Sequence, residues 1–424
     1  MTMEKWEKAV GENASKLDFS PKGLEGVLKL KPLYLDRPTT STAGTASSIS
    51  TTQTPLCASS LQAIKGANDF EAILLEVVNG VGELWIDVRK ETQALSINTF
   101  RELVACLDGH RELFPMKNLR LALLPDENFE RWYVEFRKAY MEYEFEGSLG
   151  IDPLGTLIRK DLPLVSIDQK LREMEQQMAH IAFIAMDEFK SSVQSIFVNG
   201  AQYEEAGANA VLELSYALAT AKHYLQVLKR EAGKNIRLKS QAVAEQFLFS
   251  VSVGSDFFLS LTKIRVLRDL FTQMLSEEIS ESNSVHMPIR IHACPSLREF
   301  DPQDVWSNTL RGTAGVWAAL VGNADSTLCT LIGHDEKHQA LTRFMAINTF
   351  HVLNEEAHLS KVCDPASGSY YLEHLYSELS CKVAEELALI EGEGGMVSFW
   401  EKRKHIDLAA KANAKSENQQ RNSL

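Results

Sequence analysis

The chain has 424 residues, of which 45% are hydrophobic and 24% charged, and its 44 basic and 57 acidic side chains give a net charge of −13. This is the composition of a globular protein that is long enough to bury a large core. The negative charge argues against non-specific binding to nucleic acid or to an anionic membrane, so neither is an expected partner.

The six cysteines lie far apart, with no CxxC pair and no histidine at zinc-finger spacing, and we interpret them as reduced thiols. The first ten residues, MTMEKWEKAV, lack the apolar core of a signal peptide, and no apolar run reaches the roughly 18 residues of a membrane span. The sequence therefore predicts a cytoplasmic protein.

Residues 1–36 are predicted to form an N-terminal arm, with a short helix, a turn and the alternating strand VLKLKPLYL. This segment is too short to fold alone, so we expect it to pack on another surface. Residues 37–66 begin with a stretch dominated by Ser, Thr and Ala that carries no charge after Arg37. Such a composition predicts a flexible or loosely packed linker.

From residue 67 to about residue 400, short apolar runs alternate with one-sided helical stretches. The eight runs are 83–88, 94–98, 118–124, 146–151, 193–198, 245–252, 288–294 and 326–332. Eight buried strands alternating with amphipathic helices predict an α/β fold of the (β/α)8 TIM-barrel type. The run at 94–98 is the weakest, so an open, doubly wound sheet is the alternative.

Several helix boundaries can be predicted from capping residues. Asp152 before Pro153, and Asp301 before Pro302, each place an N-cap ahead of a proline at the first helical position. Gly233 suits a helix end, and residues 370–389 have the spacing of a further helix. Residues 401–424 are predicted to be a polar C-terminal tail.

Polar side chains at the carboxyl ends of the strands are the candidates for a site, because barrels of this type place their active sites there. Asp152 and His292 are candidates for an acid/base pair, although a single His after a strand is more often a structural hydrogen-bonding residue. There is no Walker, GxGxxG or HExxH motif in the sequence. His334 and His338 could hold a metal, but a solvated helix start is the simpler interpretation, and no metal site is predicted.

Several motifs from about residue 67 to residue 396 point to one family. They are EAGANAVLELSYALA at 205–219, Phe257-Phe258 with Lys263-Ile264-Arg265, Arg290-x-His292 with Gln303-Asp304 and Asn308, Asn348-Thr349, and Asp364-Pro365 with Gly368-Ser369-Tyr370-Tyr371. These motifs resemble those of the adenosylcobalamin-dependent acyl-CoA mutases, above all the methylmalonyl-CoA mutase family. In the arm, Trp6, Val10 and the KPLY at 31–34 resemble the family segment that helps hold two related chains together.

Three departures from the family pattern indicate a non-catalytic member. The family's active-site Tyr-His pair falls on Ala201 and Gln202. The segment that grips coenzyme A and the substrate carboxylate is replaced by the Ser/Thr-rich stretch. The sequence contains no DxHxxG motif for binding cobalt, and it ends before a cobalamin-type domain. The resemblance therefore implies the small, non-catalytic subunit, with no catalytic, cofactor-binding or metal residue in this chain.

A catalytic barrel of this family lets a coenzyme A arm pass along its axis. Here bulky apolar residues occupy the strands, and we expect them to fill the barrel whichever set of alternate residues points inward. These residues are Leu119, Leu121, Leu123, Ile196, Phe247, Phe249 and Leu331. A ligand at the mouth remains open, with Asp152, Gln202, Glu205, Arg290 and His292 as weak candidate positions.

The expected function is thus that of a small subunit in a heterodimer. The catalytic large subunit would interconvert methylmalonyl-CoA and succinyl-CoA and would hold the adenosylcobalamin, and the isolated chain could form a homodimer. One alternative is the barrel subunit of a split acyl-CoA mutase that uses a separate cobalamin-binding chain. Another is a free-standing interaction barrel.

Overall fold

The computed structural model describes most of the barrel and a few residues of the arm. The described residues are 57–62, 69–89, 97–114, 116–159, 168–233, 236–279, 287–301, 304–330, 339–362 and 364–402, with Pro21, Leu24, Val27, Leu28, Leu30, Lys31 and Tyr34. The residues predicted as a polar tail, apart from 401–402, and most of the predicted arm and linker lie outside these ranges.

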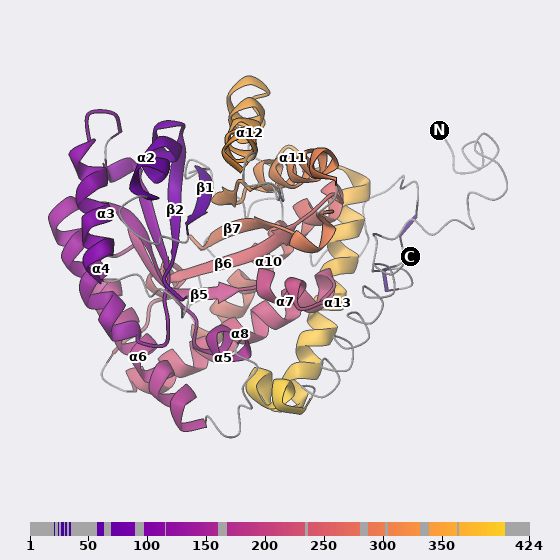
Figure 1. The fold of residues 1–424 in the computed structure, drawn as a ribbon. Coiled ribbons are helices and arrows are strands. Elements are labelled where there is room, and N and C mark those ends of the chain that lie inside the picture. The colour runs from indigo at the N-terminus through magenta and orange to yellow at the C-terminus, as the bar shows by residue number, and fades with distance from the viewer. Residues whose placement is uncertain are drawn as a thin grey trace, which may run out of the picture.

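Eight parallel strands close into a barrel in sequence order, and β1 pairs with both β2 and β8 (Figure 1). The strands are β1 (Cys57–Gln62), β2 (Val81–Asp87), β3 (Arg120–Leu124), β4 (Glu146–Ile151), β5 (Val193–Asn199), β6 (Phe247–Val253), β7 (Arg290–Pro295) and β8 (Ser326–Leu328). The prediction of a (β/α)8 TIM barrel is confirmed, and the alternative of an open sheet is wrong.

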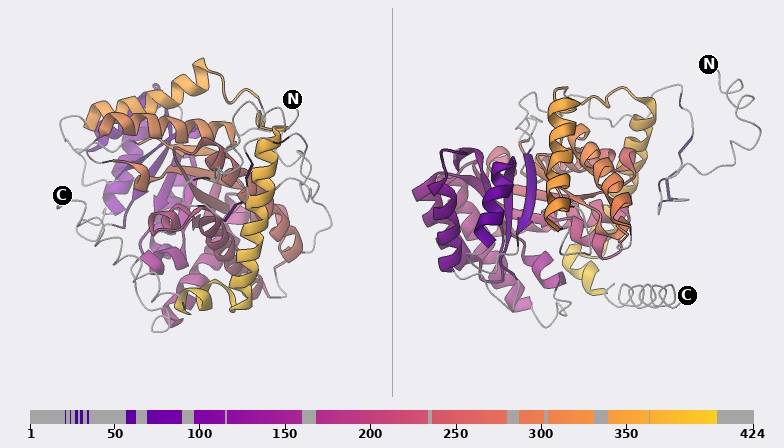
Figure 2. Two further views of the ribbon diagram at one scale, coloured as in Figure 1. Left: turned by 90° about the vertical axis from the view of Figure 1, so that its right-hand side faces the viewer. Right: turned by 45° about the horizontal axis from the view of Figure 1, so that its top comes forward.

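Helices surround the sheet (Figures 1 and 2). In Figure 1, α11 and α12 lie at the top and α13 runs along the right-hand side. The helices are α2 (Phe70–Val78), α3 (Ile97–Gly109), α4 (Phe129–Tyr143), α5 (Pro153–Arg159), α6 (Asp168–Glu188), α7 (Ala201–Glu205), α8 (Ala210–Ala232), α9 (Ser240–Ala244), α10 (Phe257–Ile279), α11 (Val305–Val321), α12 (Gln339–His351) and α13 (Tyr370–Gly392). None of the helices in the described part of the chain combines the length and apolar character needed to cross a bilayer.

The predicted number of strands is right, but one strand is missing from the prediction and one predicted strand is not observed. Strand β1 lies inside the segment predicted as linker, so the barrel begins at residue 57 and not at residue 67. The run at 94–98 does not supply the second strand, because Ile97 and Asn98 already belong to α3. The six remaining runs that correspond to β3 through β8, and the run at 83–88, lie on observed strands.

The predicted caps are mostly confirmed. The Gly155 amide donates to Asp152 Oδ1 at 2.9 Å at the start of α5, and Gly233, with a φ of +53°, is the C-cap that follows the last residue of α8. A left-handed backbone of this kind favours glycine. Helix α11, however, begins at Val305 and is capped by Asp304, whose Oδ1 accepts from the Ser307 amide at 3.0 Å; the prediction that Asp301 caps it is wrong.

The bulky apolar strand residues face the helices and not the barrel axis. Phe247 and Phe249 lie 5.0 and 4.8 Å from the ring of Phe271 on α10, and they belong to the large core between strands and helices. Leu119, Leu121, Leu123 and Ile196 are buried in the same core, while Leu331 lies outside the described residues. The prediction that these particular side chains fill the barrel is therefore wrong, because the opposite set of residues points inward.

The described arm residues contact the barrel of their own chain. The ring of Tyr34 stacks on that of His374 of α13, with centroids 3.9 Å apart and planes inclined by 18°. Leu24 and Leu28 are buried in the large core. The expectation that the arm packs on another surface thus holds at these positions.

Candidate functional site

A pocket of about 750 Å³ lies at the carboxyl ends of the strands, and we call it the mouth pocket. Barrels of this type place their binding sites at this end. Its lining residues are Leu61, Trp85, Arg89, Leu124, Ile158, Arg159, Phe197, Asn199, Ala201, Gln202, Glu205, Ala206, His292, Cys294, Pro295, Leu297, Leu328 and Trp400.

The floor of the mouth pocket is formed by aromatic side chains that point to the barrel axis. The ring of Trp85 lies 5.2 Å from that of Phe197 and 4.6 Å from that of His292. Trp85 and Phe197 form a buried cluster inside the barrel, separate from the large core, with Ala122, Leu124 and Leu248. The barrel is therefore filled at this level, as predicted, although by residues that the sequence analysis did not select.

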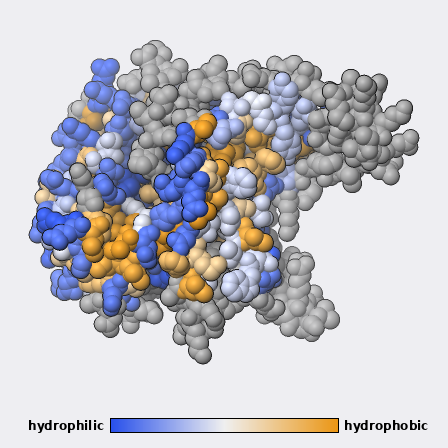
Figure 3. Space-filling view, turned by 90° about the horizontal axis from the view of Figure 1, so that it is seen from above, coloured by the Kyte–Doolittle hydropathy of each residue, from blue (hydrophilic) through white to orange (hydrophobic). Residues whose placement is uncertain are grey.

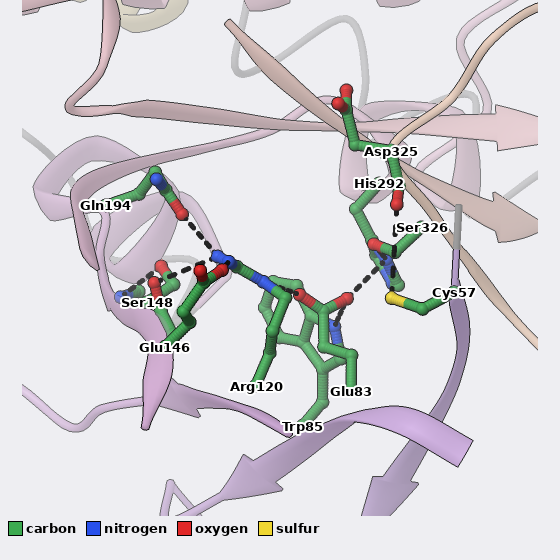
Figure 4. Close-up of polar contacts among 12 residues, drawn as sticks. Cys57, Glu83, Trp85, Arg120, Glu146, Ser148, Gln194, His292, Asp325 and Ser326 are labelled. Carbon is green, nitrogen blue, oxygen red and sulfur yellow. Dashed lines mark hydrogen bonds and ion pairs between the residues drawn. The ribbon is translucent and has the colours of Figure 1, made fainter. Parts of the chain in front are cut away.

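Below this floor, a network of charged side chains crosses the barrel at the amino ends of the strands (Figure 4). Strand register sets Glu83 beside Arg120, and Arg120 beside Glu146. Arg120 Nε donates to Glu83 Oε1 at 3.3 Å, Arg120 also pairs with Glu146, and Arg120 Nη2 donates to Gln194 Oε1 at 2.6 Å. Buried charges are tolerated when they are paired and hydrogen-bonded in this way.

Glu83 connects this network to the pocket floor. Its Oε2 accepts a hydrogen bond from Trp85 Nε1 at 3.1 Å and lies 3.5 Å from His292 Nδ1, which is also 2.8 Å from Ser326 Oγ. Burial would raise the pKa of Glu83, but hydrogen bonding to His292 and the charges of His292 and Arg120 lower it well below its usual range. The Glu83 carboxylate therefore remains ionised inside the barrel.

His292 is held as a cation by the same contacts. Burial opposes its protonation, but Cys294 and the Glu83 carboxylate raise the pKa of the imidazole to about 9. Burial and the nearby Arg290 lower the pKa of Arg120. A protonated imidazole that is already ion-paired is a poor general base at neutral pH. The structure therefore does not support His292 as half of an acid/base pair.

The rim of the mouth pocket carries two arginines in different surroundings. Arg89 binds Asp87 through two hydrogen bonds, Nε to Oδ1 at 2.9 Å and Nη2 to Oδ2 at 3.0 Å. Burial would raise the pKa of Asp87, but these contacts with Arg89 lower it. Burial and the positive charge of Arg89 lower the pKa of Arg159, while the charges of Asp152 and Asp87 oppose this effect. Within the described residues Arg159 forms no ion pair.

Asp152 caps a helix and does not line the mouth pocket. Its Oδ1 accepts from the Tyr224 hydroxyl and from the Gly155 amide, and burial raises the pKa of the carboxyl despite these bonds. His292 has other partners, so the suggested pairing of Asp152 with His292 is wrong. Arg290 is at the amino end of β7, away from the mouth. Of the five weak candidates, Gln202, Glu205 and His292 line the pocket.

The Nε2 atom of Gln202 is buried and forms no hydrogen bond with any of the described residues. Ala201 is the first residue of α7 and is buried at the pocket wall. Partial desolvation raises the pKa of the Glu205 carboxyl, and the charge of Arg89 opposes that rise. His334 and His338 lie outside the described residues, and over the ranges described no group of His, Cys, Asp and Glu has the geometry of a metal site.

Glu83 and Arg120 close the base of the barrel, and neither is among the predicted site residues. A signal for them was available, because both are charged residues within apolar strand runs. Charged side chains are almost never fully buried unless they are paired. Trp85 and Phe197 carried no such signal, because aromatic residues are common on both faces of a strand.

Residues 133–423 match the family model described as methylmalonyl-CoA mutase. The methylmalonyl-CoA mutase small subunit of Streptomyces virginiae is 29% identical over 77% of this chain and 50% of its own length. A probable methylmalonyl-CoA mutase small subunit of Mycobacterium bovis is 30% identical over 59% of this chain and 38% of its own length. The methylmalonyl-CoA mutase large subunit of Propionibacterium freudenreichii is 31% identical over 49% of this chain and 28% of its own length. The chain thus spans half or less of the length of these curated relatives.

Proposed function

This chain belongs to the methylmalonyl-CoA mutase family, and we propose that it acts as a non-catalytic, small-subunit-type component of a mutase whose large chain carries out the reaction. The observation that carries this proposal is the closure of the barrel axis. Trp85 and Phe197 fill it near the mouth, and the pair of Glu83 with Arg120 crosses it at the base.

An acyl-CoA arm along the axis would have to displace these groups. Removing one partner of a buried ion pair typically costs about 3–5 kcal/mol, because the other charge is left uncompensated. The positions of the family's Tyr-His pair offer no replacement chemistry, since Ala201 has no polar side-chain atom and Gln202 is an uncharged amide. Both features favour a structural role for this chain.

The residues of the mouth pocket also do not fit a cobalamin that is held by histidine. His292 is the one histidine among the described residues that line the pocket, and its imidazole is paired with Glu83. A metal-ligating imidazole has to be neutral. We therefore assign adenosylcobalamin to the partner chain. As a separate part of the proposal, the assembly is cytoplasmic.

The outer faces of α11 and α12 offer a surface for that partner. Trp306 and Leu310 are 70% and 73% exposed on α11, and Leu341 and Phe344 are about half exposed on α12. Both helices lie at the top of Figure 1, and the view from above shows apolar patches interspersed with hydrophilic ones (Figure 3). Contiguous exposed apolar residues commonly mark protein–protein contacts. We propose that this face meets the large chain.

Co-expression with a full-length large chain tests the proposal. The two chains should co-purify, and methylmalonyl-CoA mutase activity of the complex should be unchanged by Gln202→Ala in this chain. Calorimetry on this chain alone should detect no binding of an acyl-CoA or of cobalamin. Loss of turnover in Gln202→Ala would instead support the barrel subunit of a split mutase. Recovery of no large chain would support a free-standing interaction barrel.

A further inference from the structure

We propose that Cys294 is a modification site, at which the thiol adds to a neutral, apolar α,β-unsaturated carbonyl compound in the mouth pocket. The site consists of Cys294, His292 and the carboxylate of Glu83. This inference goes beyond the proposed role as a structural subunit, because it gives the chain a covalent chemistry of its own.

Cys294 and His292 lie two residues apart on β7, and alternate residues of a strand share one face of the sheet. Ala293, between them, is buried in the large core on the opposite face. Both side chains line the mouth pocket, and Cys294 is the one described cysteine that does so. Its thiol is only partly buried, so a compound in the pocket can reach it.

Cys294 is hydrogen-bonded to a histidine that is held as a cation. Burial opposes protonation of His292, but the charge and hydrogen bond of Cys294, and those of Glu83, raise the pKa of the imidazole to about 9. His292 Nδ1 lies 3.5 Å from Glu83 Oε2 (Figure 4). A cysteine beside a histidine that is in turn oriented by a third group is the arrangement that activates a nucleophile.

The charges inside the barrel alternate in sign up to the thiol. Glu146 pairs with Arg120, which also pairs with Glu83. Glu83 in turn pairs with His292. A thiolate at Cys294 continues this alternation at the pocket. The thiolate is the reactive form of cysteine, and a neighbouring imidazolium favours it.

The charged groups of the neighbouring strand compensate each other. Ser252 of β6 lies beside Cys294 in the register, and its hydroxyl binds both Glu213 and Lys263. Lys263 Nζ donates to Glu213 Oε2 at 2.7 Å. The charge that acts on the thiol is therefore mainly that of His292.

The rim charges of the pocket are balanced, which favours a neutral compound. Arg89 is ion-paired with Asp87, and the charges of Asp152 and Asp87 also act on Arg159. Glu205 adds a further negative charge to the lining. Neither an anion nor a cation would find an uncompensated partner at this rim.

The floor beside the thiol suits a flat apolar body. The ring of Trp85 lies 4.6 Å from that of His292 and 5.2 Å from that of Phe197. The pocket volume of about 750 Å³ is in the usual range for small molecules. A conjugated carbonyl compound is planar, and an aromatic ring attached to it would stack on Trp85 or Phe197.

The addition needs neither an oxidant nor a leaving group. The Cys294 sulfur forms a bond to the β-carbon, and the electron pair of the carbon–carbon π bond moves into the carbonyl to give an enolate. His292 then donates its proton to the α-carbon, and the neutral imidazole takes up a proton from water. This use of His292 as a proton donor agrees with its cationic form.

Labelling of the full-length chain with N-phenylacrylamide, followed by peptide mapping, tests the site. Cys381, exposed on α13, is the control within the same sample, because burial and Glu385 raise the pKa of its thiol. At pH 7 we expect Cys294 to react at least about tenfold faster than Cys381. Equal rate constants, or labelling of Cys381 alone, would overturn the proposal.

Two matched probes test the class of compound. Acrylamide lacks the ring and 4-acrylamidobenzoate adds a negative charge, and each rate constant is divided by that of the same probe with 2-mercaptoethanol. At Cys294 the corrected value for N-phenylacrylamide should exceed that of acrylamide by at least about fivefold, and it should also exceed that of the acid. A value for either probe that equals or exceeds that of N-phenylacrylamide would overturn the assignment to a neutral, apolar compound.

His292→Gln should slow labelling of Cys294 at least about tenfold at pH 7 and leave Cys381 unchanged. Between pH 8 and pH 7 the rate constant of Cys294 should fall less than about threefold in the unmodified protein and about tenfold in the variant. Cys329 is buried, so its protection from the probe shows that the variant is folded. An unchanged rate constant in folded His292→Gln would contradict the role of the imidazolium.

Ala206→Trp provides a second test that leaves the charged network in place. Ala206 is an exposed residue of the pocket lining, and a Trp side chain there should hinder entry of N-phenylacrylamide. Labelling of Cys294 should slow while that of Cys381 stays the same. Unchanged labelling of Cys294 would show that the compound does not react from within the mouth pocket.

Discussion

The ring centroids of Trp85 and His292 lie 4.6 Å apart, and both side chains contact the same oxygen of a third side chain, Glu83 Oε2. This arrangement joins the aromatic floor of the mouth pocket to the charged network below it. The floor is thus held by an ion pair as well as by packing, and its stability should depend on the charges of Glu83 and His292.

Glu83→Gln should destabilise the fold strongly. The change leaves His292 without its buried counter-charge and leaves Arg120 paired only with Glu146, and such losses typically cost about 3–5 kcal/mol in the free energy of unfolding. Urea denaturation followed by circular dichroism measures this value. Glu102→Gln, at an exposed position of α3, is the matched control and should change it by less than about 0.5 kcal/mol. A loss below about 1 kcal/mol in Glu83→Gln would show that the network contributes little.

Stability should fall with rising pH because of His292. Its pKa is raised to about 9 in the folded chain from an ordinary value of 6.5. The contribution is therefore complete below about pH 6.5 and is lost as the pH rises through about 9. The difference corresponds to roughly 3 kcal/mol as an upper value.

The measurement for His292 is the free energy of unfolding at a series of pH values between 6 and 10, compared with His292→Gln. Other groups titrate in the same range, so the difference between the two proteins is the relevant quantity. It should shrink steadily toward high pH. A difference that is constant over this range would mean that His292 is neutral in the folded protein.

The barrel could be predicted from the sequence because most of its strands are apolar runs between amphipathic helices. Strand β1 could not, because CASSLQ consists mainly of small residues, and Ser59 and Ser60 do not alternate with apolar ones. These serines are nevertheless buried, since a closed barrel pairs β1 on both edges. Only closure of the sheet, a property of the whole chain, makes this segment a strand.

Less of the candidate site than of the fold could be predicted from the sequence. The charges of Glu83 and Arg120 are visible in the sequence, but their pairing depends on the register between β2 and β3. The inward direction of Trp85 and Phe197 is likewise set by the barrel and not by local pattern. In contrast, Gln202 and His292 could be predicted as positions at the barrel mouth, because strand ends and family motifs can be recognised in the sequence itself.

Leu310→Glu on α11 should prevent assembly with the large chain while leaving the fold intact. Leu310 is 73% exposed, so the change introduces a charge on the surface and not in the core. Light scattering after size-exclusion chromatography of a mixture of the two chains measures the complex, and we expect at least about a tenfold loss of affinity. Leu113→Glu, at an exposed leucine after α3, is the matched control. Assembly that survives in Leu310→Glu would place the interface elsewhere.

Gln202→His restores one member of the family's Tyr-His pair without disturbing the barrel, because Gln202 lines the mouth pocket. If closure of the axis is what makes this chain non-catalytic, the variant should gain no mutase turnover. The assay mixes the variant with acyl-CoA, adenosylcobalamin and a separate cobalamin-binding chain, and the unmodified protein and Gln202→Ala are assayed in parallel. All three should be equally inactive, since Trp85, Phe197 and the Glu83–Arg120 pair remain in place. Turnover that appears in Gln202→His would show that the axis admits the substrate and that the missing histidine, not the filled barrel, limits the reaction.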